Sequence, residues 1–399
     1  MNATVWITGI GVVSPAGDGV AELRSLLAEG RQAVRPQDHL GGANAGAGPE
    51  PNAGHDARRF DRSAQYFLLA AEQAWADAAL GDADPETGRW VILEGSSLGS
   101  MADVLTSHRR MIDGGDRRAK PSRLLRYLAG AGGAMFAQRH GIHGRLNYLS
   151  AGSVSGLCAI GEGYERIAFG QADVAIVGGA ECPLHPEIQG GFAAAGVLAD
   201  RHDDGRCLPF DRRRGGTVLG EGSGVVVLES ESHARARGVR PRAVIEGFGI
   251  TSEGYGMTAP HPEGLGVARA IEEALNGSGR STEDVGWIKA HGTGTRANDL
   301  AECRGLAKIF GERLRDMPLT SLKSALGHSL GASGAVEMVA TVIALEDGFV
   351  PATIGTEEVD PQLPPCSVTT QVHDAPEGSV LLLAESFGGR CGALLVGRG

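Results

Sequence analysis

Short apolar runs bounded by glycines alternate with segments of helical periodicity, and this alternation restricts the fold more than any other feature of the chain. Short apolar runs of this kind are typical of buried strands, and strands that alternate with helices are typical of an α/β fold. The candidate strands are residues 4–13, 90–94, 173–180, 225–229 and 244–250. The candidate helices are residues 20–29, 62–80, 154–168 and 265–276.

The same alternation begins again near residue 240. We therefore predict two similar α/β halves, residues 1–240 and 241–399, which indicates duplication of one unit although no precise sequence repeat is present. The chain has 399 residues, 42% of them hydrophobic, and this is ample for a buried core. Its 62 glycines favour tight turns and close approaches of the backbone.

Charge, hydropathy and cysteine spacing exclude several classes of function. A net charge of −11 argues against nucleic acid as a main partner, and no apolar run approaches the length of a membrane span. Because strand-like residues follow Met1 directly, we expect neither a signal peptide nor a transit segment, and a cytoplasmic protein. The six cysteines form no CxxC pairs, which predicts reduced thiols and no metal site.

Two glycine-rich motifs resemble signatures of other enzyme classes but lack their context. Gly9-x-Gly11-x-x-Ser14 is part of a dinucleotide fingerprint, yet the third glycine is missing and no acidic residue ends a following strand about 20 residues on. Residues 95–99 match the G-x-S-x-G pattern of a hydrolase nucleophile elbow centred on Ser97. No lipase-like oxyanion loop precedes that strand, so a plain strand-to-helix turn is the favoured interpretation.

Basic residues gather between positions 108 and 126 of this otherwise acidic chain. Such a run is either a solvated face or a docking surface that attracts an acidic partner electrostatically. The candidate docking residues are Arg109, Arg110, Arg117, Arg118, Lys120, Arg123 and Arg126.

Ser153 stands where an extended segment changes into a helix. Apolar residues recur after it with helical spacing, and Gly170 marks the end of that pattern. A side chain at a helix start lies beside unpaired backbone N–H groups and the positive end of the helix dipole, which favours an anionic nucleophile or an oxyanion. Ser153 is therefore a candidate reactive residue, although a serine here also fits a helix cap.

Two histidines occupy glycine-rich loops in the second half of the chain. The candidate strand 287–290 leads directly into His291, and catalytic groups are often found at the carboxyl ends of strands. Lys323 lies five residues before His328, at a glycine-lined helix start. Either histidine alone is more often a structural residue, but together with Ser153 they indicate a catalytic site.

At these residues the chain resembles the β-ketoacyl-acyl-carrier-protein synthases, the elongating condensing enzymes of the thiolase superfamily, and most closely their type II polyketide branch. The likeness runs nearly from end to end. Its motifs are Val5-Trp-Ile-Thr-Gly-Ile-Gly-Val-Val-Ser-Pro15, Pro209-Phe-Asp, Gly220-Glu-Gly, His291-Gly-Thr-Gly-Thr, Lys323-Ser-Ala-Leu-Gly-His328 and Phe387-Gly-Gly.

The resemblance implies a thiolase-like five-layer α/β/α/β/α fold of two similar halves. It also implies a decarboxylative Claisen condensation of acyl- and malonyl-carrier-protein thioesters in polyketide or fatty acid biosynthesis. The expected partners are the acyl carrier protein and a second ketosynthase subunit, in a homodimer or a heterodimer. Because the substrates arrive on the phosphopantetheine of the carrier protein, no cofactor of the enzyme itself is expected.

The resemblance further assigns roles to single residues. His291 and His328 resemble the pair that polarises the malonyl thioester carbonyl and stabilises the enolate after CO₂ leaves. Lys323 resembles the lysine that orients this machinery, with Glu337 as its candidate partner and as a candidate substrate-binding residue. The backbone N–H groups of Ser153 and Phe387 resemble the two donors of the family's oxyanion hole. The hydroxyls of Thr293 and Thr295 resemble those that receive the pantetheine arm.

One departure from the family is central, because Ser153 occupies the place of the nucleophilic cysteine. A cysteine is partly thiolate near neutral pH, whereas a serine hydroxyl needs a positioned base. Cys158 is no substitute, since five residues along a helix it points away from residue 153. Gly215 and Thr217 also depart from the family pattern and alter the expected acyl pocket.

Three interpretations follow from this serine. In the first, Ser153 is acylated with a histidine as base, and the protein is an acyltransferase of the condensing type. In the second, the protein is a non-elongating partner of a ketosynthase, similar to a chain-length factor. In the third, cysteine was exchanged for serine by engineering. Chain-length factors generally lose the histidines as well as the cysteine, so His291, His328 and Lys323 favour a working condensing or decarboxylating site.

Overall fold

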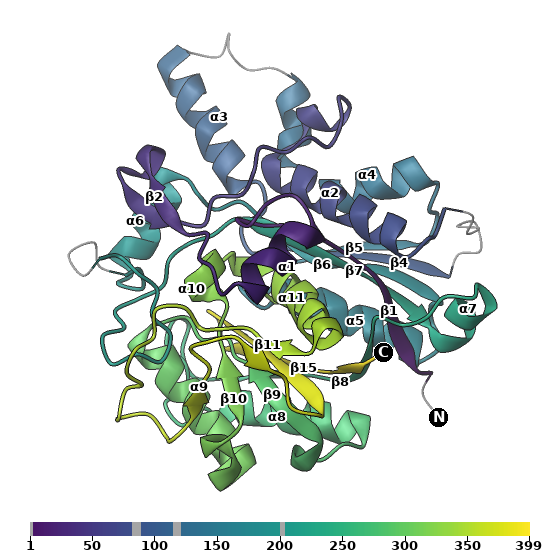
Figure 1. Ribbon diagram of the computed structural model, residues 1–399. Coiled ribbons are helices and arrows are strands. Elements are labelled where there is room, and N and C mark those ends of the chain that lie inside the picture. The colour runs from purple at the N-terminus through teal and green to yellow at the C-terminus, as the bar shows by residue number, and fades with distance from the viewer. Residues whose placement is uncertain (1–2, 82–88, 115–120, 200–203) are drawn as a thin grey trace.

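The computed structural model describes residues 3–81, 89–114, 121–199 and 204–399, with the side chains of residues 121–123 left aside. Its centre is an eleven-stranded mixed sheet, flanked by helices (Figure 1). In spatial order the first five strands of the sheet are β5 (Arg145–Leu149), β4 (Trp90–Gly95), β6 (Val174–Glu181), β7 (Gly222–Ser230) and β1 (Val5–Val13). The sheet continues with β8 (Ala243–Ser252), β15 (Arg390–Arg398), β14 (Ser379–Ser386), β9 (Val285–Lys289), β10 (Pro318–Thr320) and β12 (Ser367–Val368).

The two parts of this sheet repeat one topology. In each, the strand in the middle of a parallel triplet is the first of the three along the chain: β4 lies between β5 and β6, and β9 between β10 and β14. Two antiparallel strands then follow, β7 and β1 in one part and β15 and β8 in the other. The parts join where β1 pairs with β8 over residues 5–7 and 243–245. Identical order and direction are what duplication of one unit predicts.

Helices form three layers around the two parts of the sheet (Figure 1). The middle layer holds α5 (Ser155–Ala168) and α11 (Ser333–Asp347), which contact each other and face both parts of the sheet. The outer layers hold α2 (Arg62–Asp77) with α4 (Ala131–His140), and α8 (Leu265–Ser278) with α9 (Arg296–Phe310). The expected five-layer α/β/α/β/α fold is thus confirmed.

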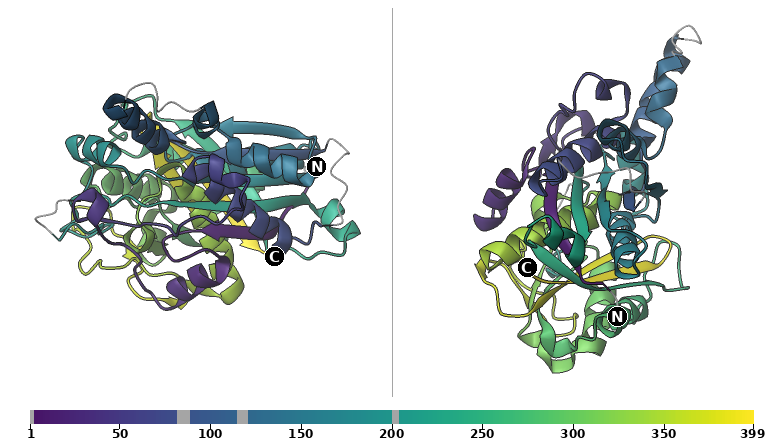
Figure 2. Two further views of the ribbon diagram at one scale, coloured as in Figure 1. Left: turned by 90° about the horizontal axis from the view of Figure 1, so that it is seen from above. Right: turned by 90° about the vertical axis from the view of Figure 1, so that its right-hand side faces the viewer.

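The remaining elements lie outside these layers. The other helices are α1 (Val20–Ala28), α3 (Met101–Gly114), α6 (Pro186–Ala194), α7 (Glu231–Ala236) and α10 (Lys323–Leu326). Two small ribbons are formed by β2 (Arg35–Gln37) with β3 (Ala43–Ala45) and by β11 (Phe349–Val350) with β13 (His373–Asp374). Figure 2 shows α3 projecting away from the body of the molecule.

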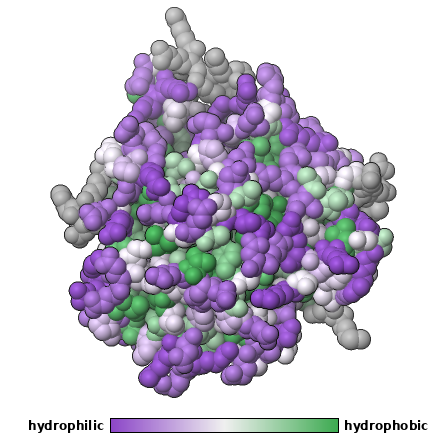
Figure 3. Space-filling model, viewed as in Figure 1, coloured by the Kyte–Doolittle hydropathy of each residue, from purple (hydrophilic) through white to green (hydrophobic). Residues whose placement is uncertain are grey.

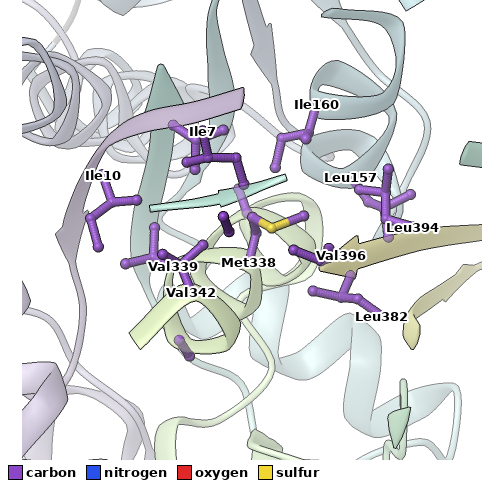
Figure 4. Packing of buried hydrophobic residues seen from close by; sticks show 14 of the residues in the cluster. Ile7, Ile10, Leu157, Ile160, Met338, Val339, Val342, Leu382, Leu394 and Val396 are labelled. Carbon is purple, nitrogen blue, oxygen red and sulfur yellow. The ribbon is translucent and has the colours of Figure 1, made fainter. Parts of the chain in front are cut away.

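The core is built around α11, which is buried along nearly its whole length. Apolar side chains reach it from both parts of the sheet and from α5, as Figure 4 shows for Ile7, Leu157, Met338, Leu382 and Val396. A helix that is apolar on all sides is stable only when it is buried. The core therefore fixes α5 and α11 side by side, and both helices begin next to the site described below.

The glycines of the Gly9-x-Gly11 motif serve packing. A Cβ on Gly9 would lie 2.2 Å from the carbonyl oxygen of Ala74, and one on Gly11 would lie 2.0 Å from that of Ala70. Such distances are impossible for a real side chain, so only glycine allows α2 to approach β1 this closely. The motif is an uninterrupted strand, β1, against a helix, and the interpretation as a dinucleotide fingerprint has no support in the fold.

The surface of the molecule determines which contacts this chain can make with its surroundings. Figure 3 shows mostly hydrophilic side chains on the viewed face, with hydrophobic residues in scattered patches. Among the described residues no helix is long and apolar enough to cross a membrane. The strand at one end of the sheet, β5, leaves its outer edge unpaired within the described part of the chain, and Leu146 on it is 40% exposed.

Candidate active site

Ser153 lies in the tight turn between β5 and α5. The turn needs glycine at residue 152, because its φ of 66° is in the left-handed region. A Cβ there would come within 3.0 Å of the side chain of Ser386, so the turn touches the loop that follows β14. Helix α5 begins at Ser155, one residue later than the sequence pattern indicates, and Ser153 therefore stands just before the helix and not in its first turn.

His328 is the side chain closest to the hydroxyl of Ser153. The Nε2 atom of His328 lies 3.1 Å from the Oγ atom of Ser153, which is hydrogen-bonding distance. The other ring nitrogen, Nδ1, lies 2.9 Å from the Oγ atom of Ser333 in the first turn of α11. This serine holds the ring in place, and because a hydroxyl can donate or accept, it fits either tautomer of the imidazole.

His291 is the second imidazole of the site and follows β9 directly. Its ring centroid is 5.3 Å from that of His328, with the two rings nearly perpendicular at 82°. The carboxylate of Glu302 on α9 accepts hydrogen bonds from the backbone N–H groups of His291 (2.6 Å) and Gly292 (2.8 Å). These bonds fix the loop, so the structure brings Ser153, His291 and His328 together from three distant parts of the chain.

Both imidazoles are held in the neutral form. Burial lowers the pKa of His291 well below its usual value, and the positive charge of Lys323 adds to this effect. Burial and the same lysine lower the pKa of His328 in the same direction. A neutral imidazole can accept a proton at one nitrogen and donate one from the other, which a protonated ring cannot do. The pair is therefore suited to acid–base work near neutral pH.

A buried ion pair lies behind the histidines. The Nζ atom of Lys323 donates to the backbone oxygen of His291 (2.6 Å) and to Oε1 of Glu337 (2.8 Å). The second carboxylate oxygen of Glu337 accepts from Lys289, whose Nζ also donates to the backbone oxygen of Leu383 (3.1 Å). One carboxylate thus holds two buried ammonium groups, and one of them anchors the backbone of His291.

In front of the ion pair, the site opens into a cavity of about 390 Å³. Ser153, His291 and His328 lie on its wall, together with the hydroxyls of Thr293 and Thr295, whose oxygen atoms are 2.9 Å apart. Its volume is in the range that small-molecule sites occupy, and the hydroxyls supply hydrogen-bond partners for an extended polar chain.

The loop after β14 forms another part of the wall. Phe387 lines the cavity, is 45% exposed, and stacks on Phe192 with 6.4 Å between the ring centroids. Among the described residues no acceptor takes a hydrogen bond from the backbone N–H of Ser153 or of Phe387. Two unused N–H donors beside the reactive hydroxyl are what an oxyanion site needs.

The comparisons with known proteins agree over the whole chain. Residues 2–234 match the sequence model "Beta-ketoacyl synthase, N-terminal domain", and residues 242–357 match "Beta-ketoacyl synthase, C-terminal domain". The chain belongs to the β-ketoacyl synthase family. The boundary that we predict near residue 240 stays a prediction.

Three relatives show how far the likeness extends. The chain is 35% identical to the "Putative polyketide beta-ketoacyl synthase 1" of Streptomyces halstedii over 98% of its length and 96% of that protein. It is 33% identical to the "3-oxoacyl-[acyl-carrier-protein] synthase 2" of Vibrio cholerae over 99% of both chains. Among solved structures, the ishigamide ketosynthase/chain length factor superposes with a TM-score of 0.92 at 31% identity over 100% of both chains.

Glu337 of this β-ketoacyl synthase does not line the cavity, although we expected it to bind substrate. Its side chain is buried in the ion pair with Lys323 and does not reach the cavity wall. We correct its predicted role from a substrate contact to the counter-ion of the two lysines. Sequence reasoning missed Lys289 and Glu302. The signal for Lys289 was a lone charged residue within a buried strand, and the signal for Glu302 was a charged residue at a helix position that faces the core.

Ser97 of the G-x-S-x-G motif also lies on the cavity wall, but its surroundings are those of a turn. The backbone N–H groups of Ser97 and Gly99 donate to the carboxylate of Glu181 (2.6 and 3.1 Å), as does that of Gly331 (3.1 Å). Burial raises the pKa of Glu181 to about 7. Glu181 therefore ties this turn to the loop that carries His328, and the motif is a strand-to-helix turn as expected.

The predicted docking surface is only partly described. Arg109 and Arg126 form ion pairs within the chain, with Glu187 and with Asp103. Arg110 is exposed on α3 and forms no ion pair with another described residue. The residues outside the described part are Arg117, Arg118 and Lys120, and Arg123 has no described side chain.

Proposed function

We propose that this β-ketoacyl synthase acts on acyl- and malonyl-carrier-protein thioesters by decarboxylative Claisen condensation, in polyketide or fatty acid biosynthesis, with Ser153 as the acyl-accepting residue. The observation that carries the proposal is the pair of neutral imidazoles around the hydroxyl of Ser153 in a cavity lined by hydroxyl groups. The names of its polyketide and fatty acid synthase relatives support the same reaction class. The reaction needs no cofactor of the enzyme itself.

In the acyl transfer step His328 acts as a general base. Its Nε2 accepts the proton of the Ser153 hydroxyl while the oxygen attacks the thioester carbon, and the Nδ1–H group donates to Ser333. The tetrahedral oxyanion accepts from the backbone N–H groups of Ser153 and Phe387. The carbon–sulfur bond then breaks, and the imidazolium returns its proton to the thiolate of the departing phosphopantetheine.

In the decarboxylation step both histidines act as hydrogen-bond donors, and His328 now carries its proton on Nε2 while its Nδ1 accepts from the hydroxyl of Ser333. As the bond between the malonyl carboxylate and C2 breaks, CO₂ leaves and negative charge grows on the thioester carbonyl oxygen. An oxygen between the rings of His291 and His328 can accept from both, and each such donor contributes about 3 kcal/mol to the transition state. The enolate carbon then attacks the acyl group on Ser153, and the bond between the acyl carbon and the serine oxygen breaks. The serine oxygen leaves as the alkoxide and takes up one proton from solvent.

A second candidate function is that of a non-elongating partner subunit. The serine at the nucleophile position favours it, and so does the likeness to a solved ketosynthase/chain length factor structure.

For both candidate functions we propose that the protein forms a dimer, with itself or with a second ketosynthase, through the exposed edge of β5. An unpaired strand edge with exposed apolar side chains such as Leu146 is a ready surface for pairing.

The test is release of CO₂ from malonyl-carrier-protein by the wild-type protein and by His291→Ala and His328→Ala. We expect decarboxylation by the wild type and a loss of about 10²-fold or more in each variant, because each removes one donor. Cys158→Ala, a change in α5 that does not touch the wall of the active-site cavity, is the matched control and should keep the wild-type rate. Unchanged rates in either histidine variant refute the assignment. Absence of decarboxylation together with co-purification of a cysteine-bearing ketosynthase supports the partner subunit.

A further inference from the structure

Three acidic side chains meet on the wall of the active-site cavity, apart from Ser153 and the histidines. They are Glu253, Glu385 and Cys391, and one ligand atom of each lies within 4.8 Å of the others. The sheet places them together, because Cys391 pairs with Glu385 on β14 and with Thr251 on β8. Strands β14 and β15 hold Glu385 and Cys391, and Glu253 lies one residue past the end of β8.

These groups have few partners of their own. Glu385 is 5% exposed, and its Oε1 atom makes no hydrogen bond to any described residue. The Oε1 atom of Glu253 is equally without a partner in the described part of the chain, and its Oε2 accepts only from the backbone N–H of His261 (3.0 Å). Neither carboxylate forms an ion pair with a described residue. A buried acceptor without a donor costs free energy, so its presence requires a reason.

The first turn of α8 is shaped to leave room for the cluster. A Cβ on Gly266 would lie 2.4 Å from Cγ of Glu253 and 2.8 Å from Sγ of Cys391, so any larger residue would push the two side chains away. Cys391 and Glu253 thus lie against the first turn of α8, whose N-terminal end carries a partial positive charge that favours anions.

The two carboxylates have no positively charged partner among the described residues. Lys323, the buried cation on this side, is already bound to Glu337. A divalent ion held between the three ligand atoms would supply the missing partner.

We propose that Glu253, Glu385 and Cys391 bind a divalent cation of the zinc class on the wall of the active-site cavity. One thiolate with two carboxylates suits zinc, whereas magnesium and calcium prefer oxygen ligands alone. Three protein ligands leave a fourth tetrahedral position, which faces the cavity. On binding, the thiol of Cys391 and the carboxyl of Glu385 release their protons to solvent. This site is independent of the proposed acylation of Ser153.

The experiment measures zinc affinity of the metal-free protein against a chromophoric chelator, and the absorption spectrum with Co²⁺. We expect one high-affinity Zn²⁺ per chain and a thiolate-to-cobalt charge-transfer band. Cys391→Ala should abolish the band, and Glu385→Gln and Gly266→Ala should each weaken Zn²⁺ binding by about tenfold or more. Glu385→Gln keeps the size of the side chain, and its thermal unfolding checks that the variant is folded.

Two controls separate this site from other thiols. Cys158→Ala removes a buried thiol elsewhere and should leave metal binding unchanged. Cys366→Ala removes a thiol that lies beside Cys303, and it should also leave metal binding unchanged. Equal zinc affinity in the wild type and in folded Cys391→Ala and Glu385→Gln, or no affinity in the wild type, overturns the proposal. The readout requires no turnover, so an inactive enzyme would still decide it.

Discussion

Glu337→Gln is the perturbation that tests most sharply how the site is held together. The wild-type carboxylate accepts hydrogen bonds from Lys323 and Lys289, and all three side chains are at most 4% exposed. The glutamine keeps the size of the side chain but removes the charge, which leaves two ammonium groups buried beside each other. Breaking a buried ion pair by removing one partner costs about 3–5 kcal/mol. We therefore expect Glu337→Gln to lose that much of the free energy of unfolding.

Glu346→Gln is the matched control on the same helix. Glu346 lies nine residues further along α11 and pairs at the surface with Arg24 (2.8 Å) and with Arg242 (2.5 Å). Exposed pairs contribute about 0.2–1 kcal/mol each, so this variant should lose about 1–2 kcal/mol at most. The assay is urea unfolding followed by circular dichroism, with equal slopes required of the variants.

The pH dependence of Glu337→Gln gives a second readout. Burial lowers the pKa of Lys289 in the folded wild type, and loss of the carboxylate lowers it further. The unfolded chain then binds more protons than the folded one at pH 7, so the free energy of unfolding rises as the pH is raised toward the usual lysine pKa. We expect part of the lost stability to return at pH 9. A loss no larger than that of Glu346→Gln, or a further loss at pH 9, refutes the reasoning.

The remaining predictions concern the histidines, the nucleophile and the docking surface. Folding lowers the pKa values of His291 and His328, so their contribution to stability is complete above about pH 6.5 and is lost as the pH falls, by up to about 1.4 kcal/mol per pH unit for each histidine. In urea unfolding, the free energy of unfolding of His291→Ala should therefore fall less steeply with decreasing pH than that of the wild type, and an equal slope contradicts this. Ser153→Cys should raise the condensation rate, measured as product formed from acyl- and malonyl-carrier-protein, because a thiolate needs no base; a lower rate argues against Ser153 as the acceptor. Arg110→Glu should weaken carrier-protein binding by up to about fivefold at low salt, measured by titration calorimetry, and equal affinity removes Arg110 from the docking surface.

The fold was predictable because its signals are local. Buried strands read as short apolar runs, and glycines mark where the runs end, so β1, β4, β6, β7 and β8 were expected within three residues of their observed bounds. Two strands of the sheet are too short for such a signal, because β10 has three residues and β12 has two. Strands this short cannot be separated from loops by periodicity.

The site was predictable only where the resemblance supplied it. Residue types and glycine-rich loops singled out Ser153, His291 and His328, but nothing in their spacing shows that Ser153 and His328 are in hydrogen-bonding distance. That contact depends on α5 and α11 lying side by side in the core. Cys391 and Glu385 illustrate the same limit, because their neighbourhood arises from the pairing of β14 with β15, and the rule of cysteine spacing that excluded a metal site considers only neighbours in sequence.

The central claim is that Ser153, with His328 as its base, accepts the acyl group. Intact-mass analysis after incubation with acyl-carrier-protein tests it most directly, with Ser153→Ala as the paired sample. Our account predicts one added acyl group on the wild-type chain, mapped to the peptide that carries Ser153, and none on Ser153→Ala. An unmodified wild-type chain, or the same added mass on Ser153→Ala, contradicts it.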